Sequence, residues 1–212
     1  MKEARAAYEK AIEQDSSIPE AWNNLGIVTE NSGRVQEALR FYNKAIRIRP
    51  MYAEAWCNKA IALSRLRKDD RAIECLDNSL KLAPENPVAW MNKGVMTSRK
   101  GNHESALECY EKALKLDDKY ALAWLNKGIA LMKTGDSAEA VTAINKALAQ
   151  RPDFPDAWYQ KARALLLAGN RDGAQICMER VLELEPEFKE TEKGRLKPVR
   201  RKGGSSRQTK AD

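Results

Sequence analysis

The sequence is poor in the residues that build catalytic and metal sites. It contains one histidine, His103, and four cysteines, no two of which form a CxxC pair. Cys75, Cys109 and Cys177 are 34 and 68 residues apart, which indicates one packing position repeated along the chain rather than a ligand cluster. The GxxxxGK[ST], GxSxG and HExxH motifs are also missing. We therefore expect a protein that is not an enzyme and requires no cofactor and no metal.

Long apolar stretches are absent as well. No run of 18 or more apolar residues is present, so the sequence predicts no membrane span. The first residues, MKEARAAYEK, lack the apolar core of a signal peptide. Together these absences predict a cytoplasmic protein.

The tryptophans, in contrast, recur at a fixed interval. Each of the five lies 34 residues after the one before it, within the related segments AWNNL, AWCNK, AWMNK, AWLNK and AWYQK. They are Trp22, Trp56, Trp90, Trp124 and Trp158. A period between 20 and 50 residues is typical of an array of stacked structural repeats.

Residues 87–120 illustrate how one 34-residue unit folds; Pro87 is taken as position 1, so that Trp90 is position 4. Apolar and small residues follow helical spacing from Trp90 onward, and the same spacing resumes from Ala106 after an interruption at Gly101. Glycine recurs at this position 15 in other units, at Gly33, Gly135 and Gly169, although Arg67 replaces it once. Each unit is therefore predicted to contain two amphipathic helices separated by a short turn.

Tryptophan at position 4, Gly or Ala at 8, Ala at 20 and Pro at 32 together resemble the tetratricopeptide repeat (TPR) family, and the AWxNKG variant resembles its prokaryotic, especially archaeal, arrays. The resemblance covers residues 1–188. It implies an all-α fold, an α-solenoid in which antiparallel helix pairs stack into a right-handed superhelix and the first helices line its concave face. The implied full repeats are 19–52, 53–86, 87–120, 121–154 and 155–188, and we expect the tryptophans to be buried as staples between the helices.

Both ends of the array depart from this pattern. Residues 1–18 match only the second helix of a unit; they represent an N-terminal cap, part of a longer array or a face that docks on another protein. Residues 189–212 carry a net charge of +6 out of +7 for the whole chain, together with Gly and Ser. Their composition predicts a basic, disordered tail.

For function, the resemblance implies that a peptide segment or a partner helix binds in the concave groove through positions 5, 6, 9 and 13 of the first helices. The implied contact residues are Asn24, Asn58, Asn92, Asn126 and Gln160 at position 6, Ile27, Ile61, Val95 and Ile129 at position 9, Met91, Leu125 and Tyr159 at position 5, and Arg65, Arg99 and Lys133 at position 13. A row of amides can hold a peptide backbone, because Asn both donates and accepts hydrogen bonds. The same amides could equally serve packing between the repeats, and the sequence leaves both alternatives open.

Two further binding modes were considered. The family's dicarboxylate clamp requires Lys at position 5 and Asn at position 9, and neither occurs here. The basic tail offers an alternative function, attachment to nucleic acid or to an anionic surface, although it contains no aromatic residue for stacking on bases.

Overall fold

The computed structural model describes residues 2–188, and this part of the chain forms α-helices and no strand. The helices are α1 (Lys2–Gln14), α2 (Pro19–Asn31), α3 (Val35–Ile48), α4 (Ala53–Arg65), α5 (Asp69–Leu82), α6 (Pro87–Arg99), α7 (His103–Leu116), α8 (Ala121–Thr134), α9 (Ser137–Gln150), α10 (Pro155–Leu167) and α11 (Arg171–Leu184). The prediction of two helices per 34-residue unit is therefore confirmed. Proline begins α2, α6 and α10, where its missing N–H is not required.

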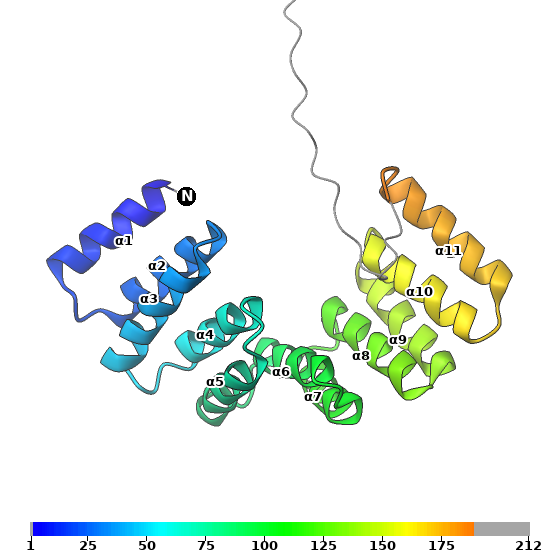
Figure 1. Ribbon diagram of the computed structural model, residues 1–212, viewed down its shortest axis with the longest axis horizontal. Helices are drawn as coiled ribbons and strands as arrows, with labels where there is room; N and C mark the ends of the chain where they lie inside the picture. The colour runs from blue at the N-terminus through cyan, green and yellow to red at the C-terminus, as the bar shows by residue number, and fades with distance from the viewer. Residues whose placement is uncertain (1, 189–212) are drawn as a thin grey trace, which may run out of the picture.

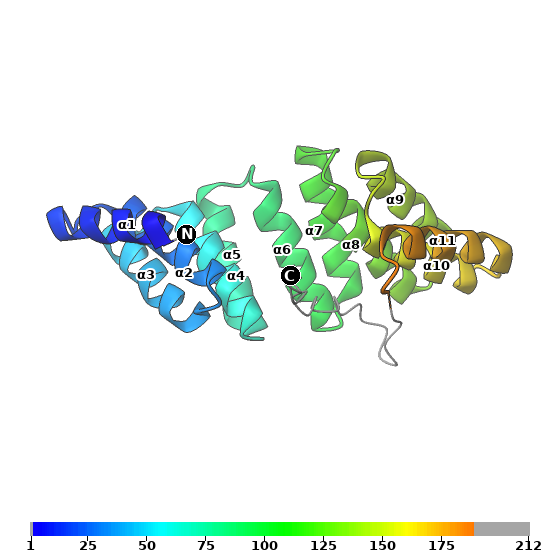
Figure 2. The same cartoon turned by 90° about the horizontal axis from the view of Figure 1, so that it is seen from above.

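The helices stack in chain order into an arch (Figures 1 and 2). Each first helix pairs with the second helix that follows it, and each pair packs against the next. The first helices α2, α4, α6, α8 and α10 also contact one another in succession, whereas within residues 2–188 the second helices do not. The first helices therefore form the inner layer of the arch and the second helices its outer layer, as α4 above α5 illustrates in Figure 1.

Within each pair, a small residue at position 8 lets the two helices approach closely. A Cβ atom added to Gly94 would lie 2.5 Å from Tyr110 Cε1, and one added to Gly26 would lie equally close to Tyr42. Both tyrosine side chains are almost completely buried. In the second full repeat the corresponding residues are Ala60 and Leu76, which belong to one core cluster. The larger residue at position 8 thus coincides with a smaller partner at position 24.

The tryptophans are mostly but not completely buried, and Trp90 and Trp124 each pack against two core clusters, which agrees with their expected place between repeats. The polar indole N–H in every repeat donates to a backbone carbonyl six residues earlier, in the turn before the helix. For Trp90 the acceptor is the Pro84 carbonyl, at 2.9 Å. This bond holds the ring at the edge of the repeat, where Lys112 Nζ lies 4.4 Å from its centroid. The largest fully buried side chains include Tyr42, Leu76 and Tyr110 at position 24.

The turn inside each repeat requires a left-handed backbone conformation. The glycines at position 15 have positive φ angles, for example 92° at Gly101. Arg67 occupies the same position with a φ of 61°, although it carries a Cβ atom. This conformation is unfavourable for a residue other than glycine.

We predict that Arg67→Gly raises the free energy of unfolding by about 1 kcal/mol, because it removes that backbone strain. The reciprocal change Gly101→Arg should lower it by a similar amount. Denaturant melts of both variants check this expectation, and an Arg67→Gly protein less stable than the parent would contradict it.

We also predict that Gly94→Ala destabilises the protein by about 1–3 kcal/mol, because the added methyl group overlaps the Tyr110 ring. The double variant Gly94→Ala/Tyr110→Leu reproduces the pair found at Ala60 and Leu76. It should therefore be more stable than the sum of the two single changes implies. Additive losses in a double-mutant cycle would show that this contact does not set the helix spacing.

Candidate functional site

The candidate site is the inner face of the arch, formed by the first helix of every full repeat. The position 9 side chains Ile27, Ile61, Val95 and Ile129 are half-buried along this layer. The position 5 residues differ from them, because Met91, Leu125 and Tyr159 retain only 8%, 5% and 3% of their exposure. Met91 and Leu125 pack against the following repeat, and the Tyr159 ring lies 5.3 Å from that of Phe188, so all three present little more than an edge to a ligand.

Asn58 at position 6 and Asn23 at position 5 take part in a chain of hydrogen bonds between the first two full repeats. Asn58 Nδ2 of α4 donates to Asn23 Oδ1 of α2 at 3.0 Å, and Asn23 Nδ2 in turn donates to Glu54 Oε1 at 3.1 Å. Asn23 is completely buried. Asn58 therefore satisfies a buried acceptor and links two successive inner helices.

The amides of the next two repeats bond to their own helices. Asn92 Nδ2 donates to the Val88 carbonyl at 2.8 Å, and Asn126 Nδ2 donates to the Leu122 carbonyl at 2.9 Å. Asn126 Nδ2 also lies 3.8 Å from Met91 Sδ of the preceding repeat. In the last repeat, Gln160 Oε1 accepts a hydrogen bond from Arg163 at 3.0 Å. Each of these amides thus forms at least one hydrogen bond within the chain.

The position 13 cations are not equivalent. Arg65 Nε lies 2.9 Å from Glu30 Oε1, and Arg99 Nη2 lies 2.6 Å from Asp69 Oδ1. Lys133 is exposed and forms no ion pair with any of residues 2–188. Of the three, Lys133 therefore carries the charge that is least compensated inside the protein.

A buried polar cluster at Glu30 was not predicted from the sequence. Tyr42 Oη donates to Glu30 Oε2 at 2.8 Å, while Arg65 approaches the other carboxylate oxygen. Burial and the neighbouring carboxylate raise the pKa of Tyr42, so its hydroxyl remains protonated and acts as the donor. The sequence did contain one indication of this cluster: position 12 is Glu30 in the first full repeat but Ser, Met or Leu in the later repeats.

The described residues contain no cluster of His, Cys, Asp and Glu suited to a metal ion. The four cysteines are buried, and burial raises the pKa of Cys57 to about 11, which keeps that thiol protonated near neutral pH. His103 Nδ1 lies 3.0 Å from Ser98 Oγ in a helix-terminal turn. Between residues 2 and 188, no helix has the length and apolar character needed to cross a bilayer.

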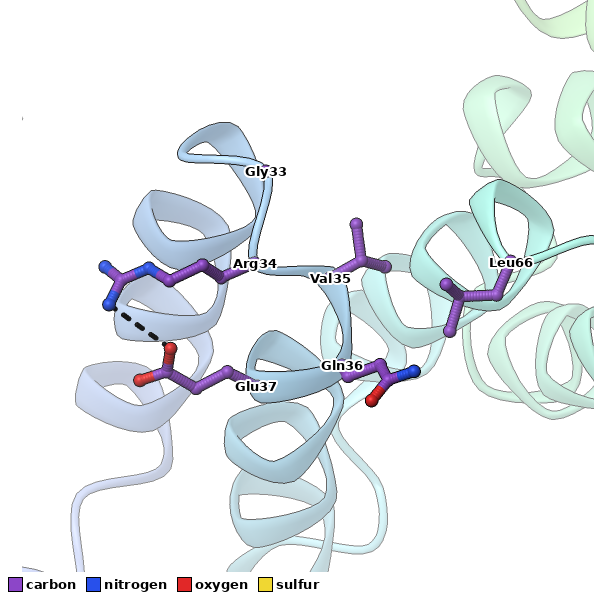
Figure 3. A pocket seen from close by; sticks show the side chains of 6 residues that line it. All are labelled: Gly33, Arg34, Val35, Gln36, Glu37 and Leu66. Atoms are coloured by element: carbon purple, nitrogen blue, oxygen red, sulfur yellow. Dashed lines mark ion pairs between the residues drawn. The ribbon is translucent and has the colours of Figure 1, made fainter.

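One open hollow of about 440 Å³ lies where the α2–α3 turn meets the end of α4 (Figure 3). Val35 and Leu66 form its apolar part, and Arg34 and Glu37 pair beside it at 3.3 Å. Its lining offers neither paired acid–base groups nor a nucleophile, so it suggests no chemistry.

Comparisons with known proteins identify the architecture. Family models described as tetratricopeptide repeat match residues 2–53, 97–153 and 125–176, and a second model with the same description matches residues 53–86. No curated protein sequence matches this chain.

Several solved structures share the fold. YrrB, described as a TPR protein with an unusual peptide-binding site, superposes with a TM-score of 0.68 at 21% identity, covering 87% of this chain and 95% of its own. MamA from Desulfovibrio magneticus superposes with a TM-score of 0.71 at 23% identity, covering 79% of this chain and 95% of MamA. PilF of Pseudomonas aeruginosa superposes with a TM-score of 0.78 at 21% identity, covering 88% of this chain and 85% of PilF. At these identities the likeness concerns the fold alone.

We predict different costs for removing two residues of the amide row. Asn58→Ala leaves the buried Asn23 oxygen without its donor and should lower the free energy of unfolding by about 1–3 kcal/mol. Asn92→Ala removes only a bond to an exposed helix carbonyl and should change it by no more than about 0.5 kcal/mol. Urea melts of the two variants provide the comparison, and equal losses would contradict the distinction.

Proposed function

Since the chain belongs to the tetratricopeptide repeat family, we propose that it is a non-catalytic scaffold that binds a peptide segment or a partner helix along its inner face. The contacts we propose are the half-buried aliphatic row at position 9, the amides at position 6 and the cations at position 13. Met91, Leu125 and Tyr159 contribute to this surface chiefly by supporting it from below.

The observation that carries the proposal is the succession of direct contacts between α2, α4, α6, α8 and α10. These contacts join five separate helices into one continuous curved surface, which a bound segment can follow across several repeats. Exposed apolar residues lie on the same surface; Val88 and Leu122 are 41% and 42% exposed. The description of YrrB as a peptide-binding TPR protein agrees with this use of the fold.

The alternative function, attachment to nucleic acid or to an anionic surface, concerns residues 189–212, which lie outside the described residues. Nothing in residues 2–188 favours it over binding in the groove, because the net charge of residues 1–188 is only about +1.

We predict that Leu122→Asp weakens binding of peptides selected by the intact chain from a random displayed library, by at least about tenfold. Folding should be unaffected, because the residue is already exposed. Leu116→Asp is the matched control, since Leu116 is 43% exposed but lies on the outer helix α7.

Affinities of the selected peptides for the three proteins test the proposal, with thermal melts to verify folding. Equal loss in both variants, or loss only in Leu116→Asp, would place binding outside the groove.

A further inference from the structure

The five full repeats can be compared with one another position by position, and at position 2 they differ in charge and polarity. This position lies in the first turn of each inner helix and holds Glu20, Glu54, Val88, Leu122 and Asp156 in succession. A carboxylate there interacts favourably with the helix dipole. Val88 and Leu122 give up that interaction and remain 41% and 42% exposed, so burial in this chain does not compensate for the change.

At the C-terminal ends of the inner helices, polar residues of the first full repeat likewise correspond to apolar residues in the last repeat. Leu166 and Leu167 at positions 12 and 13 end α10 and are 55% and 61% exposed. Their counterparts in the first full repeat are Glu30 and Asn31. The half-buried Val95 and Ile129 lie at position 9, between the two ends of their helices.

These side chains define an apolar track on the second half of the groove, over α6, α8 and α10. It comprises Val88, Val95, Leu122, Ile129, Leu166 and Leu167. The first half of the groove, over α2 and α4, carries Glu20 and Glu54 where the track carries Val88 and Leu122.

Charge follows the same division. α2 contains two glutamates and no basic residue, whereas α6 and α8 contain no acidic residue and α10 contains only Asp156. Asp156 is outnumbered in α10 by Lys161 and Arg163. The inner helices that carry the track therefore have a net positive charge.

Two cations beside the track are not neutralised by a carboxylate within residues 2–188. Lys133 forms no ion pair in this part of the chain. The Arg163 guanidinium donates to neutral Gln160 and lies 6.0 Å over the Tyr159 ring. In contrast, Lys93 and Lys127 pair with Asp77 and Glu111 of the outer helices, at 2.6 and 2.8 Å.

The amides of this region favour a helix over an extended strand as the occupant. An extended backbone requires hydrogen-bond partners from the groove, whereas a helix satisfies its own backbone groups. Asn92 and Asn126 each already donate an amide N–H to their own helix, which reduces the donors they can offer to an extended backbone. An amphipathic helix needs only apolar contact along one face, and the apolar track provides it.

We propose that the second half of the groove binds an acidic amphipathic helix, with its apolar side chains on the track and its carboxylates facing Lys133 and Arg163. This inference rests on the groove function proposed above and identifies the class of partner. Apolar burial provides the affinity, and the two unpaired cations select the sign of the charge.

The test uses the full chain and three labelled synthetic peptides, two of which form helices with the same leucine face. One has glutamates on its polar face, one has lysines, and the third is a scrambled sequence of the acidic peptide that lacks a continuous apolar face. The acidic amphipathic helix should bind saturably at physiological salt, at least about tenfold more tightly than the other two. The scrambled peptide accounts for attraction to the basic residues 189–212.

Three variants locate the interaction. Leu122→Asp should abolish binding of the acidic helix, whereas the outer control Leu116→Asp should leave it unchanged. The double change Lys133→Glu/Arg163→Glu should reverse the preference, so that the lysine helix binds more tightly. Thermal melts verify that each variant folds.

Every other pattern overturns the inference. If the lysine helix binds as well as the acidic one and depends on Leu122, or if only library-selected peptides bind and depend on it, the groove function stands and the proposed partner class is wrong. Binding of the acidic helix that is insensitive to Leu122→Asp and to the charge reversal excludes the track as its site. If, in addition, no library peptide depends on Leu122, the groove function fails as well.

Discussion

The close approach of the two helices in each pair is the constraint on which the rest of the array depends. Every full repeat has Gly or Ala at position 8, and the residue at position 24 packs against it: the Tyr110 ring lies directly over Gly94 and is nearly inaccessible to water, and Ile144 lies over Gly128. This contact fixes the thickness of one repeat. Because every repeat shares it, the inner helices are presented at regular intervals, and they touch one another while the outer helices do not. The continuous inner face is thus a consequence of packing inside each pair.

The same regularity separates structural from functional use of polar residues. The tryptophan N–H groups all bond to the preceding turn, so these residues serve the array even though they are partly exposed. Asn58 also serves the array, through the buried Asn23. Lys133 and Arg163 differ, because their charges meet no carboxylate within the described residues. If the proposed segment binds in this groove, the polar side chains over α2 and the apolar ones over α8 would distinguish its two ends.

Sequence periodicity was sufficient to predict two helices and a turn in each 34-residue unit, because helical spacing is interrupted at the same position of every unit. The inner layer of first helices was expected only from the resemblance to the tetratricopeptide repeat family. Periodicity could not predict contacts that cross from one repeat to the next. The burial of Asn23, Met91 and Glu30 depends on how far neighbouring pairs approach, which residue spacing does not specify. The partial exposure of the tryptophans depended on a single hydrogen bond of the indole, which a burial argument based on ring size overlooks.

Internal repetition also supplies what an isolated fold lacks, a comparison for each exposed position within the same chain. Arg67 departs from the glycine of its counterparts, yet it retains the left-handed turn and changes only the local backbone energy. Val88 and Leu122 depart differently, since they replace carboxylates that favour a helix start with apolar groups that stay in water. Folding of the chain gains little from such a replacement, whereas a ligand that covers these side chains would gain from it. Departures that leave the fold unchanged but expose apolar surface are therefore the positions at which we expect this chain to specify its partner.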